Sequence, residues 1–392
     1  MMEEAKTPLT WNQHLDAPSS PRESRFRESW RLFRSNRLAI SGFVIFLAFL
    51  CVALAGLFLT SGTQPRFDPA VVRLQEKLRP PLSVPNMEAL APEELPALGI
   101  YLFGTDNLGR DVFSRMLQGA WVSLTVGFVA VGISVLIGIF MGGLAGYFGQ
   151  NNIRSGHALG VLFMGTGFVL TGIGMWIASF LFFAAAAGLF LASVMYGPGR
   201  RPAPGKAPFL ALLFLPVMTV DTLIMRIVDI MLCFPSFFLI LTVVAILPAS
   251  MYNIMIIIGL TSWMGAARFV RAEFLSLREQ DFVTAAKALG VGKFRIIFRH
   301  MMPNALGPVL VSATIGIASA ILTEAGLSFL GFGVPPPHAT WGNILSDGKR
   351  FIFDAPWLTF IPGIAILIVV LSFNLFGEGL RDILNPKLRE RT

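Results

Sequence analysis

The chain has 392 residues, 54% of them hydrophobic and only 14% charged, with a formal net charge of +8. Soluble domains carry about 25% charged residues, so the composition excludes an ordinary soluble protein and predicts one that lies in a membrane. The positive charge does not indicate nucleic-acid binding, because the Lys and Arg residues flank the apolar stretches, as expected of residues that orient a protein in a bilayer.

The cysteines and histidines do not indicate a metal site or a disulfide. Cys51 and Cys233 each lie inside an apolar stretch, where a free cysteine packs as a small hydrophobic side chain. Two such residues provide neither a disulfide framework nor a zinc site. The four histidines are scattered without metal-ligand spacing: His14, His157, His300 and His338. We therefore expect the chain itself to bind no metal and no cofactor.

An α-helix needs about 20 mostly apolar residues to cross a membrane, and six stretches meet this requirement. They cover residues 39–60, 124–147, 222–247, 253–270, 305–332 and 357–376. The third should bend at Pro235. The first starts only at Ala39 and is too long for the apolar part of a signal peptide, so we expect it to be retained.

Residues 159–196 form an uncharged stretch that is too long for a single span. We interpret it as two spans that turn near Thr171–Gly174, followed by a basic linker rich in Pro and Gly. The role of the short apolar piece 209–220 stays open. Six spans and a two-helix insertion predict an all-α integral membrane protein with about eight spans.

The distribution of Lys and Arg predicts the orientation. Basic residues precede the first span and also occur in the segment 271–300, in the linker after residue 196 and in the C-terminal tail. These parts should be cytoplasmic, and the mixed, slightly acidic loop 61–101 should lie outside. We therefore expect a multi-pass protein of the cell (inner) membrane with both termini in the cytoplasm.

A polar helix–Gly–helix element interrupts the apolar stretches at residues 273–303. Asp281 is a reasonable N-cap, and Gly290 is placed to end the first helix. One face of that helix is apolar or small: Phe282, Ala285, Ala286 and Leu289. Lys293, Arg295 and Arg299 belong to the second short helix. The pattern fits either an amphipathic linker on lipid headgroups or a docking surface for a soluble partner.

The element resembles the EAA loop of ABC importer permeases. Ala285, Ala286 and Gly290 match that pattern, while Thr284 replaces its Glu and Met302 replaces the Leu before its Pro. Further segments resemble permeases of the dipeptide/oligopeptide/nickel importer family: Gly104–Leu124, Leu223–Leu239, Ala325–Gly348 and Ala355–Leu388. The N-terminal WRLFRSNRLAISGF resembles the opening of the second, "C"-type permease of these systems.

This resemblance implies a six-helix ABC type I importer permease core. It implies partnership with a homologous second permease, two ABC ATPase subunits that bind ATP and Mg, and an extracytoplasmic solute-binding protein. The substrate would be a di- or oligopeptide, with nickel or another small solute as the alternative. In this interpretation the docking residues are Phe282, Ala285, Ala286, Leu289, Gly290, Lys293, Arg295 and Arg299.

The implied division of the chain starts with a cytoplasmic N-terminal segment at 1–38 and a first transmembrane helix at 39–60. An extracytoplasmic loop at 61–120 and the permease domain at 121–392 follow, with the coupling element at 273–303. The permease domain also carries an insertion at 150–220, where the family passes directly from one span to the next. The insertion is either a lipid-facing hairpin or a docking site for another membrane subunit.

The chain is not expected to be an enzyme, because it has no phosphate-binding loop: Gly199–Ala207 has the wrong spacing and ends in Ala. An ion-coupled secondary transporter stays a more distant alternative, and it would need intramembrane charges. Glu324 lies at membrane depth and is, with Phe329, a candidate for the pathway or gate, although a structural role fits Glu324 equally. Arg226 and Asp229 are expected to form a local ion pair.

Overall fold

The computed structural model describes residues 31–384 except for 32, 35, 63–64, 89, 92–93, 155–162, 165, 168–170, 172–173 and 196–215. The basic segment before Arg31, most of the linker, the apolar piece up to residue 215 and the C-terminal tail therefore lie outside the described residues.

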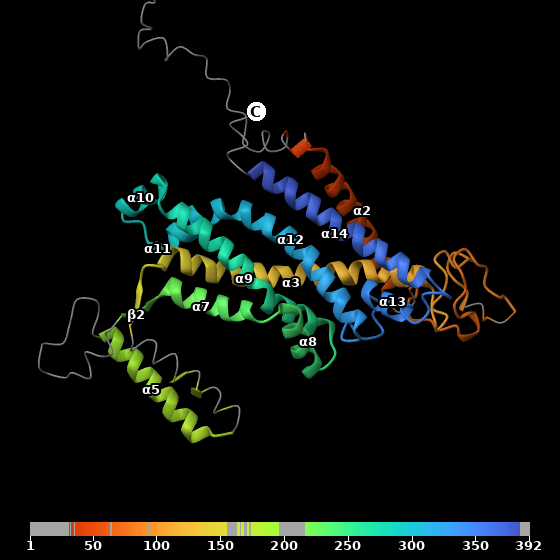
Figure 1. The fold of residues 1–392 in the computed structure, drawn as a ribbon, viewed down its shortest axis with the longest axis horizontal. Helices are drawn as coiled ribbons and strands as arrows, with labels where there is room; N and C mark the ends of the chain where they lie inside the picture. The colour runs from red at the N-terminus through yellow and green to blue at the C-terminus, as the bar shows by residue number, and fades with distance from the viewer. Residues whose placement is uncertain are drawn as a thin grey trace, which may run out of the picture.

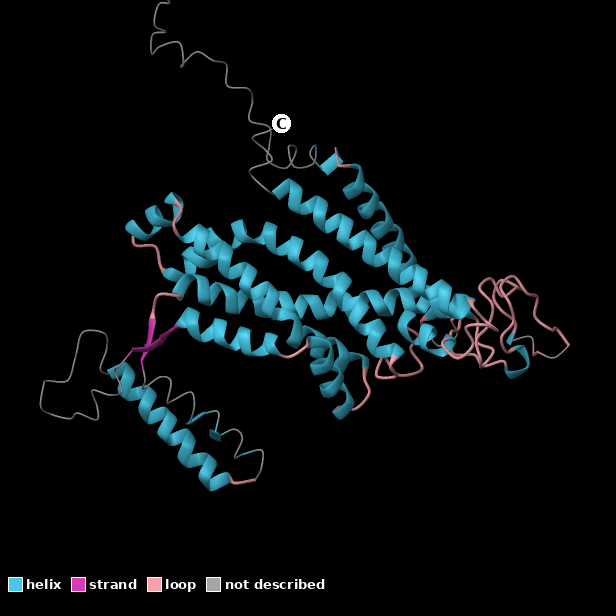
Figure 2. Ribbon diagram, in the orientation of Figure 1, coloured by secondary structure: helices cyan, strands magenta, loops and turns pink. Residues whose placement is uncertain are grey.

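Five long apolar helices form the body of the protein (Figure 1). They are α2 (Arg37–Thr60), α3 (Val112–Phe148), α9 (Met251–Arg278), α12 (Met302–Phe329) and α14 (Trp357–Leu384). Two further helices, α7 (Val220–Cys233) and α8 (Ser236–Ile246), meet at an angle of 81°. They form a sixth crossing if this bent pair counts as one span. The break lies at Phe234 and Pro235, so the predicted bend is confirmed. In the described part of the chain the fold is all-helical apart from one short ribbon (Figure 2).

The helix α3 is longer than its apolar stretch. It begins at Val112 because the Asp111 carboxylate accepts hydrogen bonds from the backbone amides of Phe113 and Ser114 and caps the helix. Its first turns carry the polar side chains Arg115 and Gln118, which are buried. The predicted start near residue 124 missed these turns, since hydropathy alone excludes polar helical residues.

Close contact between α3 and α9 depends on glycine. A Cβ atom on Gly138 would lie 2.5 Å from the Cβ of Ala266, and one on Gly259 would lie 2.7 Å from the Cβ of Ile133. Neither distance is possible for real side chains, so the two backbones approach each other only because these positions are glycine. Gly138 and Gly259 thus serve the close packing of these two helices.

At one end of the bundle, residues 61–111 form a lobe that contains a single short helix, η2 (Leu74–Glu76), in its described part (Figure 1). Glu76 is fully buried and accepts hydrogen bonds from the Arg79 guanidinium (2.9 Å) and the Asn86 amide (3.1 Å). The Trp357 indole donates to the Thr105 carbonyl at 3.2 Å and joins the lobe to α14. The lobe is thus a folded part of the protein and not a loose connection.

The insertion leaves and re-enters the bundle at a two-stranded ribbon. β1 (Asn152–Arg154) pairs antiparallel with β2 (Pro216–Thr219). A Cβ on Gly149 would lie 3.1 Å from the Cβ of Asp221, so the two ends of the insertion are adjacent in space. The described helix of the insertion, α5 (Trp176–Met195), stands apart from the bundle in Figure 1. The predicted turn is present, because the Gly174 amide donates to the Thr171 carbonyl.

Candidate coupling element and translocation groove

The polar element folds into three short pieces at the end of the bundle away from the lobe (Figure 1). They are α10 (Asp281–Ala288), α11 (Lys293–Arg295) and η4 (Ile296–Met301), a π-helical turn that runs directly into α12. The N-cap of α10 is Gln280, whose backbone carbonyl accepts from the amides of Val283 and Thr284. Asp281 is the first helical residue instead of the predicted N-cap, and there its charge favours the positive end of the helix.

The free face of α10 is narrower than the sequence pattern suggested. Phe282 and Leu289 are 41% and 82% exposed, and Ala285 is also exposed. Ala286 is only 6% exposed, because it packs into the chain's own cluster with Val283 and its neighbours. A substitution at Ala286 would therefore disturb internal packing. The structure brings Phe282, Ala285 and Leu289 together as the free surface.

Gly290 ends α10 as the pattern predicted. It has a φ of +72°, and its amide donates to the carbonyl of Lys287 at 3.0 Å. The next amide, of Val291, donates to the carbonyl of Ala286. A residue with a side chain would be strained in this left-handed conformation, so glycine here sets the direction in which the chain leaves α10.

The second part of the element presents rings and charges to the surroundings. Phe294 and Phe298 are exposed and lie parallel with ring centroids 6.5 Å apart, whereas Ile297 is buried. Lys293, Arg295 and Arg299 are all exposed. The apolar side chains of this piece are therefore divided between the interior and the surface. Pro303 lies in the first turn of α12.

Two ion pairs tie α9, which leads into the element, to α7. The Arg268 guanidinium lies 2.5 Å from the Asp229 carboxylate. The Arg271 guanidinium contacts the Asp221 carboxylate with two nitrogens, one of them at 2.6 Å. The prediction that Asp229 pairs with Arg226 was wrong, because a cation on the neighbouring helix lies closer. These two ion pairs hold α7 against the C-terminal half of α9.

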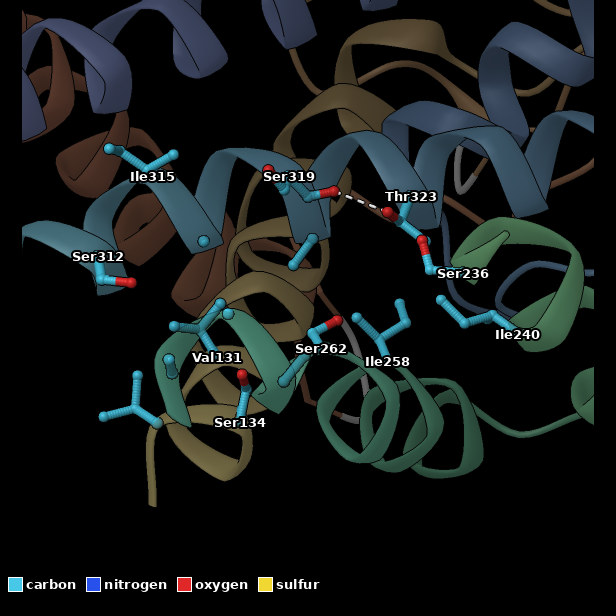
Figure 3. A pocket seen from close by; sticks show the side chains of 16 residues that line it. Val131, Ser134, Ser236, Ile240, Ile258, Ser262, Ser312, Ile315, Ser319 and Thr323 are labelled. Carbon is cyan, nitrogen blue, oxygen red and sulfur yellow. Dashed lines mark hydrogen bonds between the residues drawn. The ribbon is translucent and has the colours of Figure 1, made fainter. Parts of the chain in front are cut away.

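A groove of about 300 Å³ lies between α3, α8, α9 and α12 (Figure 3). Hydroxyl groups are its most frequent polar groups: Ser134, Ser236, Ser262, Ser312, Ser319 and Thr323. None of its lining side chains is charged. Ser262 and Ser319 are exposed, which is costly on a surface that faces hydrocarbon. The sequence analysis missed this set, although Ser312, Ser319 and Thr323 have the spacing of one helical face.

The two residues proposed for the pathway or gate lie elsewhere. Glu324 is fully buried, and its carboxylate accepts a 2.6 Å hydrogen bond from the Ser328 hydroxyl. Phe329 is 38% exposed, and the Lys349 ammonium lies 5.2 Å from its ring centroid. Neither residue lines the groove. Glu324 belongs to the packing at the end of α12, where the hydroxyl of its partner Ser328 lies 3.4 Å from the Thr340 hydroxyl, which precedes α13 (Trp341–Gly348).

A largely buried charge network lies at the end of the bundle that carries the lobe. The Asp106 carboxylate lies 2.7 Å from the Arg110 guanidinium and 2.5 Å from that of Arg115. Asp347 of α13 contacts the same two arginines, at 3.0 and 2.9 Å. The network joins the lobe, α3 and α13, and it forms one wall of a second cavity of about 420 Å³ beside His338. In the described part of the chain, no group of three or more His, Cys, Asp or Glu side chains is placed to hold a metal ion.

Comparison with known proteins agrees with the membrane-helical fold described above. Residues 207–390 match the family described as binding-protein-dependent transport system inner membrane component, and residues 24–81 match the N-terminal transmembrane domain of oligopeptide transport permease C. The chain is 35% identical to the dipeptide transport system permease protein DppC of Alkalihalophilus pseudofirmus over 93% of its own length and 91% of that protein. The chain belongs to the DppC/OppC family of ABC permease subunits.

Other members of this family show the same degree of similarity. The oligopeptide transport system permease protein OppC of Bacillus subtilis is 30% identical over 94% of this chain and 91% of its own. The DppC protein of Haemophilus influenzae is 32% identical over 98% and 99%. The resemblance stated from the sequence motifs is confirmed. This DppC/OppC-type permease is a multi-pass membrane transport protein, and its family is one of permeases and not of enzymes.

Proposed function

We propose that this permease forms one half of the pathway through which an ABC importer moves di- or oligopeptides across the cytoplasmic membrane. The relatives' names support the substrate class. The exposed hydroxyl-lined groove is the observation that carries the proposal, because a single chain leaves it incompletely covered. A homologous second permease would cover it and supply the other wall. A neutral wall of hydroxyls suits peptide amides and accepts side chains of either charge.

The proposed driving force comes from two separate ATPase subunits docked on the coupling element. The free face of α10 offers Phe282, Ala285 and Leu289 as contacts, with Arg295 and Arg299 beside them. Because η4 continues into α12 without a break, a displacement of α10 would tilt α12. That helix carries Ser312, Ser319 and Thr323 of the groove. ATP binding would thus alternate the groove between the two sides of the membrane.

The proposed orientation places the coupling element and both termini in the cytoplasm and the lobe outside. The start of α2 and the end of α14 lie together, since the Asn36 amide donates to the Asp382 carboxylate at 3.4 Å. The lobe, at the other end of the bundle, would meet the solute-binding protein. Single cysteines at Leu289 and Leu98, both exposed, test this arrangement: a membrane-impermeant maleimide added to intact cells should label only Leu98→Cys.

The experiment that tests the function uses the transporter purified with the subunits that accompany it and reconstituted in proteoliposomes. ATP-dependent uptake of a labelled dipeptide should be present in the native protein. A Ser319→Trp variant should lose uptake, because the indole fills the groove, while assembly and ATP hydrolysis persist. Leu136→Trp, at an exposed position of α3 outside the groove, is the control. Normal uptake by the Ser319 variant would contradict the proposed pathway.

A further inference from the structure

A third cavity, of about 590 Å³, lies where α3 and α9 end and the helix that continues into α12 begins, beside the coupling element. Its walls come from the end of α3 with Tyr147 and Phe148, from the end of α9 with Arg278, and from the coupling element with Lys287 and Lys293. This cavity is separate from the hydroxyl-lined groove and shares no residue with it. The transport cycle described above assigns it no role.

The charges in this cavity are unbalanced. Arg278 has a carboxylate partner, because its guanidinium lies 3.1 Å from Glu279. Lys287 and Lys293 form no ion pair with a carboxylate within the described part of the chain. The Lys287 ammonium donates only to the Arg278 carbonyl, at 3.5 Å, and the Lys293 ammonium lies 5.8 Å from the Phe148 ring centroid. Two ammonium groups beside one cavity attract an anion.

The position of the cavity indicates where this anion comes from. The spanning helices α3 and α9 end at the cavity, and the helix that continues into α12 starts there, so the cavity lies where the chain passes from membrane-spanning helices into the polar element. Tyr147 and Phe148 lie ring against ring, with centroids 4.8 Å apart, and aromatic residues are typical of the headgroup level. The exposed ring pair of Phe294 and Phe298 lies on the adjoining piece of chain.

We propose that this cavity binds the phosphate group of an anionic ligand through Lys287 and Lys293, and that the ligand is the headgroup of an anionic phospholipid. Basic pockets between membrane helices recognise such headgroups by the same chemistry. Because Lys287 belongs to α10 and Phe148 to α3, a bound headgroup would hold the coupling element against the fixed part of the bundle. The inference rests on the cavity and its charges and does not require the transport proposal to be correct.

The test uses the full-length chain in mild detergent, titrated with phosphatidylglycerol or with phosphatidylcholine. Bound lipid is counted by native mass spectrometry, and affinity is taken from the rise of the thermal unfolding midpoint. The double variant Lys287→Gln/Lys293→Gln should bind phosphatidylglycerol at least about tenfold more weakly, since each basic residue near a membrane surface contributes about 1 kcal/mol. Phosphatidylcholine should have no comparable effect on the native chain.

The control variant Arg295→Gln/Arg299→Gln removes the same charge from the same element but lies outside the cavity. It should keep the native affinity, and Lys287→Arg/Lys293→Arg should keep most of it. If both glutamine double variants lose the same affinity for phosphatidylglycerol, the proposal is overturned. The lipid would then be attracted by the positive charge of the whole element and not bound in this cavity. Equal stabilisation by inorganic phosphate at matched ionic strength would assign the site to a free phosphate ion. The proposal would also be overturned if neither phosphatidylglycerol nor inorganic phosphate stabilises the chain and Lys287 crosslinks to a carboxylate of an ATPase subunit in the assembled transporter. The cavity would then be a protein contact.

Discussion

The guanidinium of Arg115 and the carboxylate of Asp106 lie 2.5 Å apart, and both side chains are almost completely buried. Arg115 belongs to the first turns of α3, whereas Asp106 belongs to the lobe that precedes it. This contact is therefore one of those that fix the lobe to the bundle, beside the hydrogen bond from Trp357 to Thr105. A buried pair of this kind is costly to break, because the remaining charge has no solvent to compensate it.

We expect Asp106→Ala to lower the free energy of unfolding by about 3 kcal/mol, the low end of the usual cost of breaking a buried pair, because Arg115 would keep Asp347 as its carboxylate partner. The measurement is thermal or denaturant unfolding of the purified chain in detergent. Arg79→Gln is the control, since Arg79 is partly exposed and its carboxylate partner Glu76 keeps the hydrogen bond from the Asn86 backbone amide. A loss of stability no larger than in that control would contradict the inferred role of Asp106.

Gly138 should not tolerate a side chain. The Cβ of Gly138→Ala would meet Ala266, and Gly138→Val would force α3 and α9 apart. Overpacking of a tight interior usually costs about 1–3 kcal/mol, and the valine variant should express poorly. Gly132, in the same helix, has open space around its Cβ position. Gly132→Val should therefore insert and fold normally, as measured by monodisperse elution after purification.

The free face of α10 can be tested by size. Ala285→Trp should abolish ATPase binding while the isolated chain keeps its thermal stability, because Ala285 is exposed. Ala286→Trp should lower the thermal stability of the isolated chain, since Ala286 is buried. Thr284→Trp, about 140° around the helix from Leu289, serves as the control for binding. Co-purification of the ATPases with each variant distinguishes the cases, and undiminished binding by Ala285→Trp would remove α10 from the docking surface.

The ionisation of Tyr101 should report on the lobe. Burial raises its pKa to about 12, with Glu76 adding to the effect and Arg73 opposing it. An unfolded tyrosine ionises near pH 10, so the folded chain keeps a proton that the unfolded chain loses. The stability contribution is complete below pH 10 and falls as the pH rises toward 12.

The corresponding measurement is the ultraviolet absorbance of phenolate during alkaline titration. The native chain should show a phenol that ionises at about pH 12, and Tyr101→Phe should remove that phase. This substitution should not destabilise the chain at neutral pH, because the Tyr101 hydroxyl is buried without a hydrogen-bond partner among the described residues. If the substitution instead removes absorbance that appears near pH 10, Tyr101 is accessible to solvent.

The apolar stretches and the motifs were sufficient to predict the family, the helical class and the short helix that ends at Gly290. They could not predict an ion-pair partner or the burial of a side chain where this depends on how two helices pack. Arg226 and Arg268 are both plausible partners for Asp229 from sequence, and only the packing of α7 on α9 selects Arg268. Ala285 and Ala286 belong to the same small pair in the motif, but the fold buries one of them.

The groove illustrates a different limit. Serine and threonine are common in membrane helices, and a hydroxyl that bonds to its own helix gives no signal beyond its spacing. Thr323 forms such a bond to the Ser319 carbonyl at 2.8 Å. Only the meeting of four helices brings these groups together (Figure 3). In the sequence, Glu324 indicated a pathway more strongly than the hydroxyl residues, because a charged residue is rare inside a membrane span. In the structure it is buried beside Ser328 and does not line the groove.

The ribbon of β1 and β2 means that residues 155–215 are a side branch of the chain. The pairing of Asn152 with Thr219 brings the end of α3 to the start of α7, which is where a shorter chain would pass directly from one to the other. Excision of the branch, with Arg154 joined to Pro216 through a short turn, would leave the order and neighbours of the remaining helices unchanged. The branch could therefore have been gained or lost in a single genetic event without redesign of the transporter around it.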